Sequence, residues 1–352
     1  MSESCVATLA KAPRGRQSHA LVVPRVLSPY RTSRLARECT MDRRTVLKTM
    51  LAVSAAPDVP ASRSEAQLCG SECASVVSVM QFGAKGDGVH DDLPAFKAAH
   101  NALGAAGGVL TGLQRTYRFA GTLTISNPVT IDFFNTTVTP YDGHGAILRS
   151  KENAPILEYA GVWSRFVGLR NINVVGVNDG SARSQDGVVV NNGATVPRLI
   201  AGGIRISNVS IFNTGRHGLY LRNSYAASYE NLHTQSCGDS GVLIDVHCGG
   251  NLWRGISTVA NGSAGFNVSS ADGSDTVIGL VSEQNPYGIV LGAGVSGWEF
   301  IGVHTEANSR TPLLFKERSD RNRVGFTSIG GGGESTPVNH GGHRNSWSGG
   351  EP

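Results

Sequence analysis

Hydrophobic positions repeat regularly in the second half of the chain. The apolar runs GLYL, GVLI, GFNV and GIVL begin at Gly218, Gly241, Gly265 and Gly288, and PLLF follows at Pro312. Successive runs are 23 or 24 residues apart, and a turn rich in polar residues precedes each. Similar runs begin at positions 145 and 187, separated by longer loops. A fixed period of this length indicates a solenoid of stacked short strands.

A second short strand is predicted before each turn. Counting back from the start of each run, the positions nine and seven residues upstream are mostly apolar or threonine: Val209 and Ile211, Leu232 and Thr234, Ile256 and Thr258, Gly279 and Val281, Val303 and Thr305. Because side chains alternate along a strand, we expect these residues to point inward and their neighbours outward. A coil of about 23 residues with two or three strands is typical of a parallel β-helix, in which stacking completes the core. The Leu-x-x-Leu-x-Leu pattern of leucine-rich repeats is missing.

The segment FGAKGDGVHDD at residues 82–92 concentrates glycine and aspartate. It lacks the Lys-Ser/Thr pair of a phosphate loop and the acidic spacing of an EF-hand. Three glycines permit sharp turns, and Asp91 and Asp92 precede LPAFKAAHNALGAAGG, which has helical periodicity. Aspartate is a favourable residue at a helix start. We therefore expect turn and cap residues here rather than catalysts.

These residues resemble the opening of the pectate lyase-like superfamily, in the branch of rhamnogalacturonase-type, epimerase-type and tailspike β-helices. The residues that match are Phe82, Gly83, Ala84, Gly86, Asp87, Gly88, Asp91 and Asp92. The following LTGLQRTYRF keeps Tyr117 but lacks the family's proline, and the resemblance extends weakly over residues 76–330. It implies an all-β, right-handed parallel β-helix with a short helix capping its N-terminal end.

Four segments are expected along the chain. Residues 41–66 resemble a twin-arginine export signal through Arg43, Arg44 and Lys48, with a cleavage site at residues 64–66. Residues 1–40 are then a disordered or mis-assigned extension, with Met41 as the true start. The β-helix domain covers 67–330, and residues 331–352 are expected to be a flexible glycine-rich tail. This organisation predicts a periplasmic or extracellular protein.

Charge and hydropathy argue against two kinds of partner. The net charge of +4 comes from the first 66 residues, which hold 11 of the 31 Lys/Arg and 5 of the 27 Asp/Glu. The remaining 20 basic and 22 acidic residues give no electrostatic reason to expect nucleic acid. No apolar run reaches the length of a membrane-spanning helix. Four cysteines follow Met41, and the sequence-local disulfide pairings are Cys69 with Cys73 and Cys237 with Cys248.

The family resemblance implies work on polysaccharide along an outward face. The polygalacturonase pattern is absent apart from a partial echo at Arg216, His217 and Gly218. His304 and Glu306 share one face of a strand, and Glu283 lies one coil away, which makes Glu283 and Glu306 the candidate carboxylate pair. His233 lies in the His304 column three coils earlier, roughly 14 Å away.

Several other residues are weaker candidates. Arginines 216, 222 and 254 could neutralise a uronate, Asp239 and Asp245 could bind calcium, and Tyr220, Trp253 and Trp298 could stack on sugars or be buried. No particular cofactor is predicted beyond this calcium option.

The sequence thus predicts an exported carbohydrate-active β-helix protein, monomeric or homotrimeric, that cleaves or modifies a polysaccharide, with uronate-containing polysaccharides among the candidate substrates. A lyase, a glycosidase and an epimerase all remain open as the reaction type. The alternatives are a non-catalytic polysaccharide-binding or surface β-helix and a prophage tailspike-like protein.

Overall fold

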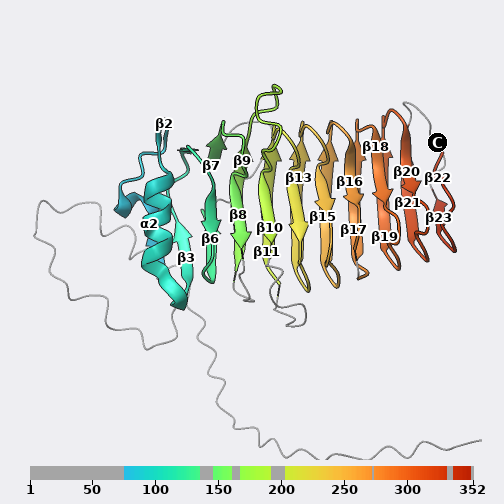
Figure 1. Ribbon diagram of the computed structural model, residues 1–352, viewed down its shortest axis with the longest axis horizontal. Helices are drawn as coiled ribbons and strands as arrows, with labels where there is room; N and C mark the ends of the chain where they lie inside the picture. The colour runs from blue at the N-terminus through green and yellow to red at the C-terminus, as the bar shows by residue number, and fades with distance from the viewer. Residues whose placement is uncertain are drawn as a thin grey trace, which may run out of the picture. The chain divides into compact units, whose positions relative to one another are not determined.

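The structure is a computed structural model that describes residues 75–134, 146–160, 167–191, 203–271, 273–330 and 336–349. The predicted export signal at 41–66, the extension before it, and Cys69 and Cys73 lie outside these residues. Strands dominate, and they stack next to one another in the order of the chain (Figure 1). All recorded strand pairings are parallel. The predicted fold class, a right-handed parallel β-helix with a capping helix, is confirmed.

Two sheets run through the stack. The first has the path β1 (Val76–Ser78), β3 (Gly108–Thr111), β6 (Val129–Asp132), β9 (Gly168–Val175), β11 (Arg205–Phe212), β13 (Ser228–Gln235), β15 (Leu252–Val259), β17 (Thr276–Glu283), β19 (Glu299–Glu306), β21 (Arg323–Ile329) and β23 (Ser346–Gly349). The strands β2 (Asp87–Asp91), β4 (Thr116–Phe119) and β7 (Ile147–Ser150) join it through β9. The second sheet holds β5 (Leu123–Ile125), β8 (Leu157–Ala160), β10 (Val188–Asn191), β12 (Leu219–Arg222), β14 (Val242–Ile244), β16 (Ala264–Val268), β18 (Tyr287–Leu291), β20 (Thr311–Phe315) and β22 (Val338–Asn339).

The long strands of the first sheet bend in the middle. Residues with positive φ occupy the same column in successive coils: Asn171, Asn208, Asn231, Gly255, Gly279 and Gly302. Asparagine and glycine are the residues that adopt this left-handed conformation most readily. In keeping with the bend, β6 pairs with the first half of β9, whereas β7 pairs with its second half. Each coil therefore has three short strands.

The inward columns form one continuous apolar core. Val209, Leu232, Ile256 and Val303 are fully buried, as the alternation predicted. The coil of β17 differs, because Leu280 and Ser282 point inward in place of Gly279 and Val281. Here the turn after the strand is one residue shorter than in the preceding coil, so an alignment on the following glycine assigns every side chain to the wrong face.

Asparagine side chains hold the turns of successive coils together. Asn285 Oδ1 accepts hydrogen bonds from the backbone N–H and the Nδ2 of Asn261, and Asn308 Oδ1 accepts one from the backbone N–H of Asn285. A second ladder connects Asn322 with Asn345 in the same way. All but Asn345 are buried, so each satisfies backbone groups that would otherwise lack partners.

The helix α2 (Leu93–Leu103) closes the N-terminal end of the stack (Figure 1). Two short 3-10 helices, η1 (Val79–Phe82) and η2 (Gly104–Ala106), flank it. Phe96 is fully buried and packs edge-on against Tyr117 and Phe119, with its ring centroid 5.2 and 4.8 Å from theirs. Helix α2 is too short to cross a membrane, and no other helix among the described residues is longer.

The segment FGAKGDGVHDD runs from the end of η1 through a turn and strand β2 to this helix. Gly83, Gly86 and Gly88 all have positive φ. Asp92 is the first residue before α2, but its carboxylate accepts hydrogen bonds from the backbone of Lys85 and Gly86 rather than from the helix. The helix N–H of Leu93 donates instead to Asp91 Oδ1. Both aspartates have structural partners, which supports the turn-and-cap interpretation.

Two sequence expectations differ from the structure. Cys237 and Cys248 are buried and form no disulfide, so the predicted pairing is wrong. Within the predicted tail at 331–352, β22 and β23 continue the two sheets. Ser346 and Trp347 pair with Arg323 and Val324, although the segment has too few apolar residues to show a strand pattern.

Candidate functional site

Glu283, His304 and Glu306 come together on the outward side of the long sheet. Glu283 ends β17, Glu306 ends β19, and the two are direct neighbours across the parallel pair. His304 lies two residues before Glu306, so both side chains point to the same face. The predicted proximity of the three residues is therefore observed, and it follows from the register of the two adjacent strands.

The imidazole of His304 lies between the two carboxylates. Its Nε2 is 3.3 Å from Glu283 Oε1 and 3.4 Å from Glu306 Oε2. The side chains of Glu283 and His304 are about one-third exposed, and that of Glu306 is 55% exposed. The face is thus accessible to a large ligand. Among the described residues, no other group of three such side chains gathers this closely.

The same three residues fit a divalent transition metal. One nitrogen and two carboxylate oxygens lie within 4.8 Å of one another. Two ligands bound to zinc at a tetrahedral angle are about 3.4 Å apart, close to the two distances at His304. An imidazole ligand suits zinc and its neighbours better than calcium, which prefers six or more oxygens.

His233 does not belong to this cluster. It occupies the same column as His304, three strand pairs earlier, through Ser257 and Val281. Its Nδ1 lies 3.1 Å from Ser257 Oγ and its Nε2 lies 3.2 Å from Gln235 Oε1. Burial lowers the pKa of the His233 imidazole. Its ring nitrogens therefore have partners within its own surroundings.

A second polar cluster was not recognised as such in the sequence. Asp186, fully buried, forms a bidentate ion pair with Arg216 and also accepts a hydrogen bond from the backbone of His217. Burial lowers the pKa of His217, against the opposing effect of Asp186 and Asp239. The available signal is that Asp186 and His217 each stand directly before the glycine that opens an apolar run.

The two candidate calcium ligands, Asp239 and Asp245, have partners of their own near this cluster. Asp245 accepts hydrogen bonds from Tyr220 and Ser269, and its carboxylate is 3.9 Å from Arg222. Asp239 accepts one from Ser240 Oγ. Neither aspartate belongs to a three-residue ligand group in the described part of the chain, so the geometry does not support the calcium option there.

The two tryptophans considered as sugar-stacking candidates lie in the core. Trp253 and Trp298 are fully buried. Trp253 stacks on Tyr229 at 4.1 Å between ring centroids, and its indole N–H donates to Asp275. Neither ring is available to stack on a sugar.

Comparison with solved structures supports the fold. ORF18 of Geobacillus virus E2 superposes with a TM-score of 0.57 at 16% identity, over 77% of this chain and 61% of that one. The enzymatically active domain of tailspike protein 2 from bacteriophage CBA120 superposes with a TM-score of 0.52 at 15% identity, over 73% of this chain and 43% of that one. The chain thus spans less than two thirds of either structure. No family model and no curated protein matches the sequence. The similarity defines the class of protein, a parallel β-helix.

Proposed function

We propose that the protein is an enzyme that cleaves or modifies a polysaccharide, with Glu283 and Glu306 as its paired carboxylates. The observation that carries this proposal is the convergence of Glu283, His304 and Glu306 on an accessible face. The saccharide substrate is supported by the family resemblance at residues 82–92. Glycosidases use two carboxylates on either side of the scissile bond.

The nearest oxygens of the two carboxylates are close enough for hydrolysis with retention. The ligand oxygens of Glu283 and Glu306 lie within 4.8 Å of each other. Retaining enzymes hold their carboxyl groups about 5 Å apart, whereas inverting enzymes need roughly 6.5–9.5 Å to admit water. In this scheme one carboxyl group protonates the leaving oxygen while the other attacks the anomeric carbon. Water then releases the sugar from the carboxylate. His304 contacts both groups and holds them in place.

The test is incubation of the protein with pectins, alginates and bacterial exopolysaccharides. Hydrolysis releases reducing ends without new ultraviolet absorbance, whereas elimination also produces an absorbing unsaturated product. We expect Glu283→Gln and Glu306→Gln to lower kcat by about 10²–10⁴-fold. The control is Glu230→Gln, because Glu230 lies on β13 and bonds only to Ser228 among the described residues.

Two results would contradict the proposal. Full activity in both Glu306→Gln and His304→Ala would show that these residues are not the catalytic site. Binding of a polysaccharide without any turnover would favour the non-catalytic alternative.

We also propose that the protein is exported, which rests on the pattern around Arg43 and Arg44. N-terminal sequencing of the secreted material should find a chain that begins near residue 67. Mature protein that begins at Ser2 would contradict the proposal and the assignment of Met41 as the start.

A further inference from the structure

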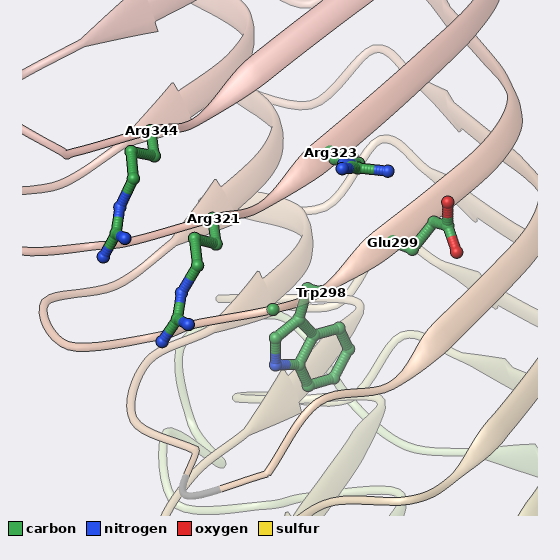
Figure 2. Close-up of a pocket in the computed structure, with 6 residues that line it drawn as sticks. Trp298, Glu299, Arg321, Arg323 and Arg344 are labelled. Carbon is green, nitrogen blue, oxygen red and sulfur yellow. The ribbon is translucent and has the colours of Figure 1, made fainter. Parts of the chain in front are cut away.

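Three arginines line a pocket at the opposite end of β19 from Glu306. The pocket has a volume of about 440 Å³ and is lined by Gly297, Trp298, Glu299, Arg321, Arg323 and Arg344. Figure 2 shows Arg321 and Arg344 extending in the same direction, with Arg323 and Glu299 beyond Trp298. Since β19 bends at Gly302, this pocket is separate from the Glu283, His304 and Glu306 cluster.

The first two arginines are oriented by one carboxylate. Asp320 Oδ2 lies 3.0 Å from Arg321 Nε, while Arg344 makes two contacts with Asp320 at 3.0 and 2.6 Å. Arg321 and Arg344 occupy the same position in successive coils, since the residues that follow them, Asn322 and Asn345, are ladder partners. Strands of neighbouring coils are about 4.8 Å apart, so the two guanidinium groups form a short positive row.

The backbone at these arginines is costly. Arg321 has φ 53° and Arg344 has φ 50°, a region that disfavours residues with a side chain. The corresponding positions in earlier coils are Ala226, Gly250, Ser274 and Gly297, and all of these except Ser274 also have positive φ. Glycine would adopt this turn without strain, whereas each of the two arginines adopts it at a cost to the backbone, as Ala226 does. Such strain is often found where a side chain has a functional task.

The charged residues of the pocket give it a net positive charge, which favours an anionic ligand. Three arginines face two carboxylates, Glu299 and Asp320. Arg323 forms no ion pair with any described residue, and the side chains of Arg321 and Arg344 are 63% and 68% exposed. Guanidinium groups bind carboxylate and sulfate oxygens through paired N–H groups.

We propose that this pocket binds the carboxylate or sulfate group of an acidic saccharide, apart from the candidate catalytic residues. The saccharide part rests on the proposed function, whereas the anionic part rests on the three arginines alone. The competing explanation is that Arg321 and Arg344 only join two coils through Asp320. The two explanations predict different effects of substitution on stability.

The test uses the double variant Arg321→Gly with Arg344→Gly. Because glycine accepts positive φ, we expect its Tm to be unchanged or higher, while its affinity for an oligogalacturonate falls at least tenfold in calorimetry at low salt. Arg323→Gln should also weaken binding. The control is Arg205→Gln, which removes an exposed arginine from the same strand position on β11.

Further ligands separate the sources of the anion. A sulfated oligosaccharide should compete with oligogalacturonate, and a neutral oligosaccharide should bind no more tightly to the parent protein than to the double variant. Unchanged affinity of the double variant, or a large fall in its Tm, would overturn the proposal. Inorganic sulfate that binds as tightly as the oligosaccharides would overturn the saccharide assignment. Binding is measured in the Glu306→Gln background, so failure of the proposed hydrolysis is recognised separately by the activity assay.

Discussion

At the scale of single residues, burial makes two histidines weaker bases than a histidine in water. His217 and His233 have lowered pKa values, in both cases chiefly because burial disfavours the charged imidazole. For His217 the nearby carboxylates Asp186, Asp239 and Asp245 oppose this effect, whereas Arg216 adds to it. Neither direction could be predicted from sequence, because each depends on which side chains from other coils face the ring.

These lowered pKa values predict a loss of stability in acid. A histidine that binds protons more weakly in the folded than in the unfolded state destabilises the fold as pH falls through its unfolded pKa, near 6.5. Urea unfolding of the parent protein should therefore show a lower midpoint at pH 5.5 than at pH 7.5. In the His217→Asn, His233→Gln double variant this difference should shrink. An equal pH dependence in the two proteins would show that the histidines do not carry it.

At the scale of elements, the repeat itself was visible in the sequence, but its register was not. The glycines at 218, 241, 265 and 288 mark the start of strands in the second sheet. Their positions do not show how many residues the preceding turn contains. Counting back from Gly288 therefore predicted the wrong inward residues for the coil of β17. Strand pairing is decided by burial and hydrogen bonding between coils, which is why Glu283 lies directly opposite Glu306.

The asparagine ladder should be the most sensitive polar element. Asn285 accepts hydrogen bonds from Asn261 and donates to Thr258 O and Ser282 Oγ, and all three partner residues are buried. Each buried group left without a partner costs about 1–3 kcal/mol. We expect Asn285→Ala to lower the free energy of unfolding by about 3 kcal/mol in denaturant titration.

The matched control for the ladder is Asn178→Ala. Asn178 is exposed and donates one hydrogen bond, to Ser236 O, so its loss should cost about 1 kcal/mol or less. Similar losses in the two variants would mean that the ladder contributes little beyond an ordinary surface contact.

At the scale of the whole solenoid, the N-terminal end depends on its capping helix. A stack of coils leaves apolar surface and unpaired strand edges at each end, and a cap prevents association through them. In this protein α2 covers that end with Phe96 at the centre of an aromatic group that includes Tyr117, Phe119 and Phe133. The resemblance at residues 82–92 located this cap correctly.

Truncation of the central aromatic ring should weaken the cap. We expect Phe96→Ala to lower the free energy of unfolding by about 3–5 kcal/mol, because Phe96 is fully buried. Light scattering should also detect association as the helix opens. Lys97→Ala, one residue further along on the exposed side of α2, should change stability by less than about 0.5 kcal/mol. Association of both variants to the same extent would contradict this role.

The sequence by itself determined the solenoid, because periodic apolar positions and glycine-containing turns are local features. They can be recognised in the sequence without knowing which residues are in contact. It also determined the capping segment and the set of outward residues that includes His304 and Glu306. Only the tertiary structure showed which of these residues are in contact with one another. Neighbours in a β-helix are about 23 residues apart in the chain, so one residue more or less in a turn changes every partner. The meeting of Glu283 with His304, the arginine row beside Trp298, and the buried pair of Asp186 with Arg216 all depend on that stacking.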